Sequence, residues 1–137
     1  MHEWALAEAV IASASQTAER ERLKEVSVLK VKLGELQQVD REIFENALSE
    51  ILRLEKPPLR GARADLEVEK AAFRCRSCRR EWKLEAALRG KDPEETEAIH
   101  FLPEMIYVYV RCPGCASPDF EILRGRGVWL ESLDGDS

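Results

Sequence analysis

The sequence of 137 residues lacks the features that mark several large classes of protein. It has no run of 18 apolar residues, which excludes a transmembrane helix. Its start, Met1-His2-Glu3, is not a basic segment followed by an apolar one, so we expect no secretory signal and a cytoplasmic protein that does not bind membranes. Basic residues are not in excess, because 21 Lys and Arg stand against 26 Asp and Glu. The net charge of -5 is the opposite of what a general nucleic-acid binder needs.

The residue sets of common enzymes are also missing. We find no Ser/His/Asp set, no glycine loop for a phosphate and no pair of catalytic carboxylates, so we expect a protein that is not an enzyme. The chain is nevertheless 45% hydrophobic, which is enough to bury a core. Its length fits one domain, or two small domains that share a modest core.

Hydrophobic periodicity predicts two helices and a short sheet. An alanine-rich stripe predicts a helix over 3–22, and Asp40 is a good N-cap for a second helix that Pro57-Pro58 ends. We expect Trp4, Trp82 and Trp129 in the core. Alternating apolar residues predict strands over 26–34, 64–70, 105–110 and 128–133, and the acidic stretch 90–97 suggests a loop.

The order of these elements predicts an α+β fold. Two helices cover one face of a small sheet of about three strands, and the last strand returns to that sheet. A metal-stapled lobe is inserted before the last strand. We therefore expect an α+β domain made of residues 1–72 and 122–137, and a cysteine-containing domain at 73–121.

Four cysteines form two Cys-x-x-Cys pairs, Cys75 with Cys78 and Cys112 with Cys115. Each pair suits two corners of a tetrahedron, and four thiolates are a common ligand set for structural Zn²⁺. The lobe between the pairs is too small for a good apolar core, so a metal would supply much of its folding free energy. Four arginines near the first pair would offset the charge of the thiolates: Arg74, Arg76, Arg79 and Arg80. A rubredoxin-like iron, a redox pair and free buried thiols are the alternatives.

His2 suggests a second metal site. A free α-amine, the amide nitrogen of residue 2 and the His2 imidazole can hold one ion in a planar set of nitrogens, which suits Ni(II) or Cu(II). We expect Met1 to be retained, and Glu3 could add an oxygen or a hydrogen bond to the imidazole. The amine and the imidazole must lose their protons to bind, so acid should release the ion. An exposed tail histidine with no ligand role is the alternative.

Taken together, Met1-His2-Glu3, the leading amphipathic helix and the two cysteine pairs resemble the HypA/HybF family of nickel-incorporation proteins, and the long segment between the pairs resembles archaeal members. The resemblance implies a nickel metallochaperone of [NiFe]-hydrogenase maturation. It implies Ni²⁺ as cargo at Met1 and His2 with Glu3 beside them, and a structural Zn²⁺ at Cys75, Cys78, Cys112 and Cys115. It also implies a HypB-type GTPase and the [NiFe]-hydrogenase large subunit as partners. A homodimer stays open.

His100 is the one other histidine in the chain, which makes it the natural candidate for a fourth nickel ligand. Its segment would then act as an arm that closes over the N-terminus and opens to release nickel. A histidine packed between Ile99 and Phe101 is the alternative. A second function for the whole chain also stays open, a zinc-ribbon adaptor that binds RNA or protein through the arginine-rich first cysteine pair.

Overall fold

The computed structural model describes residues 3–37 and 39–137, and their contacts divide into two compact units. The first unit contains residues 3–32, 39–67 and 128–137, and the second contains residues 33–37 and 68–127. This division also assigns residues 33–37, 68–72 and 122–127 to the cysteine-containing unit. The sequence predicts one domain made of residues 1–72 and 122–137, and another made of residues 73–121. These boundaries stay a prediction.

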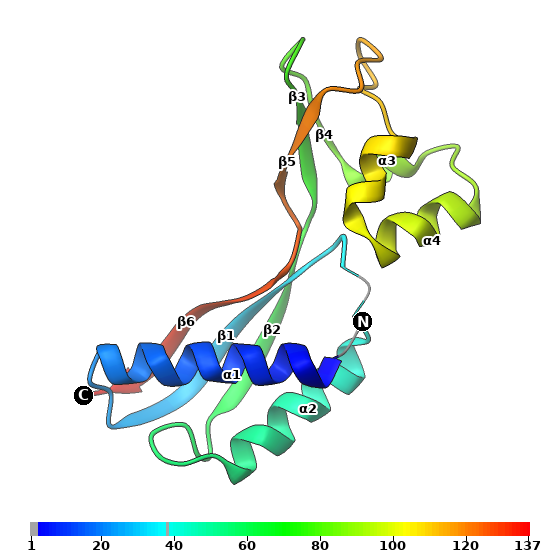
Figure 1. The fold of residues 1–137 in the computed structure, drawn as a ribbon. Helices are drawn as coiled ribbons and strands as arrows, with labels where there is room; N and C mark the ends of the chain where they lie inside the picture. Colours follow the sequence, from blue (N-terminus) through cyan, green and yellow to red (C-terminus); the bar gives the residue numbers. More distant parts are fainter. Residues whose placement is uncertain (1–2, 38) are drawn as a thin grey trace. The chain divides into compact units, whose positions relative to one another are not determined.

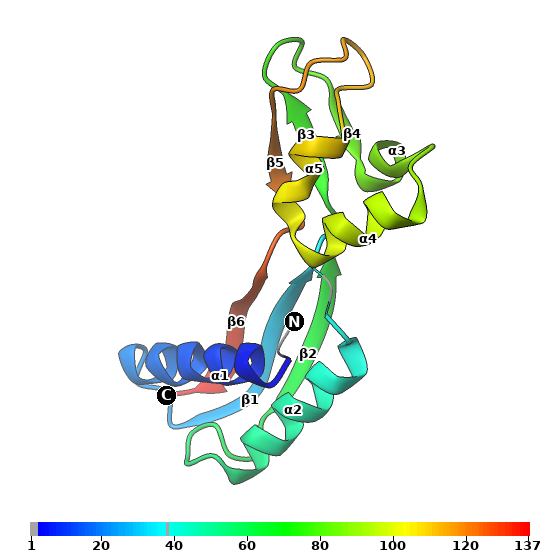
Figure 2. The same cartoon turned by 45° about the vertical axis from the view of Figure 1, so that its right-hand side comes forward.

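The first unit is two helices over one face of a three-stranded sheet with the order β2-β1-β6. Figures 1 and 2 show both helices on the same side of this sheet. The last strand lies beside β1, as expected. The elements are α1 (Glu3–Arg20), β1 (Glu25–Gly34), α2 (Arg41–Leu54), β2 (Arg63–Glu69) and β6 (Val128–Asp136).

The core of the first unit follows from the periodicity of each element. Helix α1 buries Ala7, Val10, Ile11, Ala14 and Ala18, which recur at the spacing of one helical face. They pack with the buried residues of α2 and with Leu29 and Val31 of β1. The predicted N-cap is confirmed, because Asp40 Oδ1 accepts a hydrogen bond from the Ile43 amide at 3.1 Å. No helix among the described residues is long and apolar enough to cross a membrane.

The other face of this sheet carries charges. Lys32 of β1 lies in its middle, and its Nζ is 2.8 Å from Glu67 Oε1 of β2 and 3.2 Å from Glu131 Oε2 of β6. The lysine therefore links all three strands, and its side chain is only 17% exposed. The alternation of apolar and charged residues in β1 places the core on one face and this ion-pair row on the other.

The second unit contains a three-stranded antiparallel sheet with the order β4-β3-β5. Phe73 of β3 lies opposite Trp82 on one side and Ile122 on the other, and Cys75 lies opposite Phe120. The strands are β3 (Ala72–Cys75), β4 (Glu81–Lys83) and β5 (Phe120–Arg124). The helical segments between β4 and β5 are α3 (Leu84–Leu88), α4 (Pro93–Phe101), η1 (Pro103–Met105) and α5 (Ile106–Tyr109).

A short segment after β1 completes the second unit. The Leu36 side chain is fully buried in the second core, together with Phe73 and Phe120. Its amide donates a hydrogen bond to the Gly125 carbonyl at 2.9 Å. This contact explains why residues 33–37 belong to the cysteine-containing unit although they include the last two residues of β1.

Two expectations about the segment between the cysteine pairs are wrong. The acidic stretch predicted as a loop begins α4, because Asp92 caps the helix and Pro93 follows at its first position. The strand predicted over 105–110 is instead the end of η1 and helix α5. Its apolar residues favour a strand locally, but Ile106 and Val110 are both buried and lie four residues apart, which is helical spacing.

The predicted burial of the tryptophans is confirmed at one position of three. Trp82 is 6% exposed, and its ring packs against Phe73 and Phe120. Trp4 is 49% exposed and Trp129 is 42% exposed, so neither is a core residue. Trp4 lies in the first turn of α1, three residues before Ala7, which is the first buried residue of that helix.

Candidate metal centre

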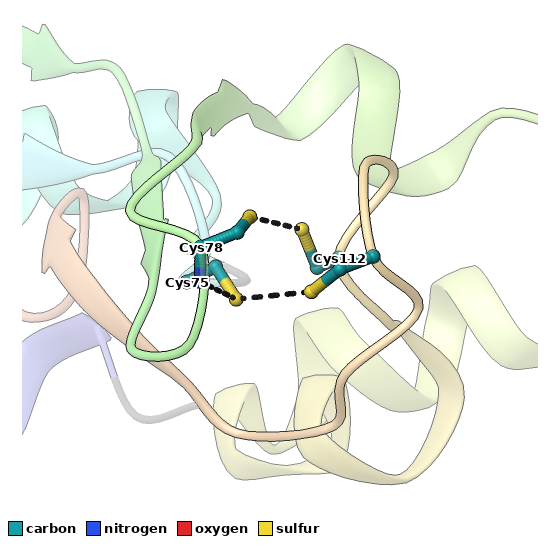
Figure 3. Close-up of side chains that lie close together, drawn as sticks. Cys75, Cys78 and Cys112 are labelled. Atoms are coloured by element: carbon teal, nitrogen blue, oxygen red, sulfur yellow. Dashed lines mark hydrogen bonds between the residues drawn. The ribbon is translucent and has the colours of Figure 1, made fainter.

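Two turns bring the four cysteines together at one end of the second unit. Cys75 ends β3 and Cys78 lies in the turn that leads to β4, whereas Cys112 and Cys115 lie in the loop before β5. Figure 3 shows the two loops facing each other with their sulfurs between them. Ligand atoms of all four residues lie within 4.8 Å of one another. The Cys75 and Cys115 sulfurs are 3.5 Å apart, and those of Cys78 and Cys112 are 3.6 Å apart.

These distances fit a tetrahedral metal ion and exclude disulfides. Zn–S bonds of about 2.3 Å in a tetrahedron place the sulfurs about 3.8 Å apart, whereas a disulfide needs about 2.05 Å. All four cysteines are free. Two backbone amides also point at sulfurs, from Cys78 to Cys75 at 3.4 Å and from Gly114 to Cys112 at 3.3 Å. The donor set and its spacing therefore suit a closed Zn(Cys)₄ centre, with no position left for a substrate.

The same amides change the acidity of the thiols. The hydrogen bond from the Cys78 amide, aided by Ser77, lowers the pKa of Cys75 to about 6. Burial raises the pKa of Cys112, but the amides of Cys115 and Gly114 outweigh it and the pKa is lowered. The Ser117 amide lowers the pKa of Cys115, but the Cys75 sulfur, burial and the other two sulfurs together raise it to about 12. The Cys75 thiol is therefore more acidic than an ordinary thiol, and the Cys115 thiol is less acidic.

The arginines predicted to surround the centre divide into two groups. Arg74 donates to Glu121 at 2.7 Å, and Arg76 donates to Asp119 at 3.0 Å. These carboxylates belong to the loop before β5 and to β5 itself, so each ion pair joins the segment of the first cysteine pair to the segment that follows the second. Arg79 and Arg80 are exposed, and Arg80 lies against Gly114 of the second pair. The sequence analysis missed both carboxylates, although acidic residues at alternate positions just after Cys115 were a signal for such partners.

An aromatic cluster lies in the core beside the cysteines. The Phe120 ring contacts Phe73 at 5.9 Å, Trp82 at 5.2 Å and Tyr107 at 4.9 Å between ring centroids. Phe120 is fully buried, and the same core contains Cys75 and Cys112. The two buried cysteines thus anchor the centre in the core, while Cys78 and Cys115 face solvent.

The residues predicted for nickel lie in both units. Met1 and His2 lie outside the described residues. Glu3 begins α1, and its Oε1 accepts a hydrogen bond from the Asp40 amide at 3.1 Å, so it ties the start of α1 to the cap of α2. His100 lies in the last turn of α4 in the second unit and is half-buried. The nickel ligand set stays a prediction.

Comparisons with known proteins identify close relatives over the full length. The family model described as hydrogenase/urease nickel incorporation, metallochaperone, HypA matches residues 1–135. A hydrogenase maturation factor HypA of Pyrococcus abyssi is 43% identical over 133 residues, which cover 97% of this chain and 94% of the relative. The factor of the same name from Thermococcus sibiricus is 40% identical over 140 residues, with 99% of both chains covered.

Solved structures share the fold. The solution structure of the nickel metallochaperone HypA from Helicobacter pylori matches with a TM-score of 0.66 at 20% identity, covering 100% of this chain and 99% of the other. A second solution structure, of a HypA protein, matches with a TM-score of 0.63 at 21% identity, covering 98% and 96%. The expected α+β fold class is confirmed by these matches and by the elements described above.

Proposed function

Since this chain belongs to the HypA family of nickel-incorporation metallochaperones, we propose that it carries Ni(II) at its N-terminus and delivers it to the [NiFe]-hydrogenase large subunit during maturation. The observation that carries this proposal is the family match over residues 1–135. The alternative, a zinc-ribbon adaptor acting through the first cysteine pair, has no support from the comparisons. Two of its arginines, Arg74 and Arg76, are already engaged by carboxylates within the same unit.

The proposed nickel site uses the nitrogens of Met1 and His2. The α-amine, the residue 2 amide and the His2 imidazole form fused rings around one ion, and this planar set favours Ni(II). The hydrogen bond from Asp40 to Glu3 supports the site, because it fixes the residue that follows His2. We propose His100 as the fourth ligand.

The four cysteines hold a structural zinc in this proposal. The sulfur spacing and the amide donors described above support Zn²⁺, which would hold the exposed Cys78 and Cys115 together with the buried Cys75 and Cys112. In this account the first unit is the nickel-binding domain and the second unit is the zinc-binding domain. The zinc ion supplies folding free energy to a unit whose core is small.

The proposed partners follow from the family. A HypB-type GTPase would supply the nucleotide hydrolysis for which this chain carries no motif, and the hydrogenase large subunit would receive the nickel. We propose that the chain is a carrier and not an enzyme. Four free thiols suit the reducing cytoplasm, where we place the exchange. A homodimer is compatible with this role.

Nickel titration of three chains tests the proposal. Wild-type protein, His2→Ala and a chain with one glycine added before Met1 are titrated by calorimetry after zinc loading. We expect one nickel per wild-type chain, at least a hundredfold weaker binding in both variants, and one zinc in all three. Equal nickel affinity in the three chains would overturn the proposed site.

A further inference from the structure

Arg80 occupies an unusual position at the cysteine centre. Its residue follows the first cysteine pair, but its side chain extends across to the second pair. A methyl group built on Gly114 would lie 2.8 Å from Arg80 Nε and 3.1 Å from its Cδ, so the side chain passes directly over the Gly114 backbone. Gly114 is the residue before Cys115, and its missing side chain leaves room for this contact.

The glycine that Arg80 contacts is part of the centre. The Gly114 amide donates to the Cys112 sulfur at 3.3 Å. The side chain of Arg80 packs against this glycine, so it restricts the movement of the loop that presents the amide to the Cys112 sulfur. The backbone of Arg80 belongs to the centre as well, because its carbonyl accepts a hydrogen bond from the Cys75 amide at 2.8 Å. One residue thus contacts both cysteine pairs.

Charge favours the same placement. Four thiolates around a divalent ion carry a net charge of -2. Arg74 and Arg76 form ion pairs with Glu121 and Asp119, as described above, so their charges are already balanced. Arg80 brings its positive charge to the exposed side of the centre, where Cys78 and Cys115 face solvent. That side is where a chelator or an alkylating reagent would first reach the sulfurs.

We propose that Arg80 is a positioning residue that clamps the second cysteine pair and slows the exchange of the bound metal, and that Gly114 serves to admit its side chain. This inference rests on the proposed zinc site. It explains why the Arg80 side chain lies against a residue of the second cysteine pair, and it predicts that the bound metal exchanges slowly.

Zinc transfer from the loaded full-length chain to a chromogenic chelator tests the clamp. Arg80→Gln removes the guanidinium, and Gly114→Ala displaces it while keeping its charge, since the obstructing atoms belong to a flexible side chain. We expect both variants to hold one zinc and to release it about tenfold faster than wild type. Arg79→Gln, which removes the same charge from the exposed neighbour, is the matched control and should change the rate less than twofold.

The double variant Arg80→Gln/Gly114→Ala separates the clamp from a general loosening. If Gly114 acts only by admitting Arg80, the double variant releases zinc no faster than Arg80→Gln alone. The clamp would be overturned if the two substitutions multiplied each other's effect on the release rate in the double variant. It would also be overturned if Arg79→Gln accelerated zinc release as much as Arg80→Gln. Unchanged rates in Arg80→Gln would do the same. A wild-type chain that holds no zinc at all would overturn the zinc site and the clamp with it.

Discussion

Glu3 joins the starts of the two helices of the first unit. The sequence allows it to be a ligand or a hydrogen-bond partner of His2. In the structure its Oε1 accepts from the Asp40 amide at 3.1 Å, which joins the first residue of α1 to the cap of α2. Asp40 at the same time caps α2 through Ile43, so the two helix starts share one polar contact.

Glu3 variants should distinguish an anchor from a ligand. Glu3→Gln keeps an oxygen that can accept from Asp40, whereas Glu3→Ala removes it. If Glu3 acts as an anchor, nickel affinity falls about tenfold in Glu3→Ala, the effect of one lost hydrogen bond of about 1.4 kcal/mol, and stays within threefold of wild type in Glu3→Gln. Calorimetric titration checks this, and equal losses in both variants would show that the carboxylate itself binds nickel.

Lys32 gives the first unit a dependence on pH. Its hydrogen bond to Glu67 raises the pKa of Lys32 above its ordinary 10.5, against the effect of burial, and lowers the pKa of Glu67 below its ordinary 4.5. The Glu67 contribution to stability is complete above pH 4.5 and is lost as pH falls through the lowered pKa. The Lys32 contribution is complete below pH 10.5 and is lost as pH rises through the raised pKa.

Lys32→Met should therefore remove part of this dependence. We expect the wild-type melting temperature to fall below pH 4.5, and to fall less steeply in Lys32→Met because Glu67 and Glu131 have lost their shared partner. Thermal melts by circular dichroism between pH 3 and 7 measure the two slopes. The control is Lys30→Met, whose pair with Asp134 is longer, at 3.7 Å, and half exposed. Parallel curves for wild type and Lys32→Met would contradict this account.

At the scale of elements, the sequence predicts best where periodicity and capping agree. The starts of α1 and α2, strand β1 and the cap at Asp40 all follow from local patterns. Helix α4 was missed although Asp92, Pro93 and Glu94 form a recognisable helix start, because the acidic composition suggested a loop. Helix α5 was missed for a different reason. Its residues favour a strand, and burial of Ile106 in the core overrides that preference.

The cap of α4 can be tested directly. Asp92 Oδ1 accepts from the Glu95 amide at 2.9 Å, and its carbonyl accepts from the Thr96 hydroxyl at 3.2 Å. Asp92→Ala should lower the free energy of unfolding by about 1 kcal/mol, because one amide of the first turn loses its partner. Denaturant unfolding of the zinc-loaded chain measures this. Asp92→Asn keeps the acceptor and should remain close to wild type, so a similar loss in both variants would contradict the capping role.

At the scale of the whole molecule, the two units depend on metal to different degrees. The first core is made of α1, α2 and the β2-β1-β6 sheet and contains no cysteine. The second core contains Cys75 and Cys112. Spacing alone predicts that these cysteines meet their partners. It does not predict that residues 33–37 complete the second core, since Leu36 follows a strand of the other unit and its burial depends on tertiary contacts.

Removal of zinc should therefore loosen one unit selectively. We expect the rate of amide hydrogen exchange in β3 and β5 to rise at least tenfold when a chelator removes the metal. The reason is that the second core then loses the ion that links its two cysteine pairs. Exchange in α1 and α2 should change little. Hydrogen-exchange mass spectrometry with and without zinc provides the comparison. Protein that is stripped of zinc and then reloaded with it is the control. Equal increases in both units would contradict a separate, metal-dependent second unit.

The central claim is that nickel travels on the nitrogens at the start of the chain while zinc stays among the sulfurs. X-ray absorption at the nickel edge of the zinc- and nickel-loaded chain tests it most directly. The account predicts a first shell of nitrogen and oxygen ligands in a near-planar arrangement, with no sulfur. A shell that contains sulfur, at the distances of a cysteine thiolate, would contradict it and would place the cargo in the cysteine centre.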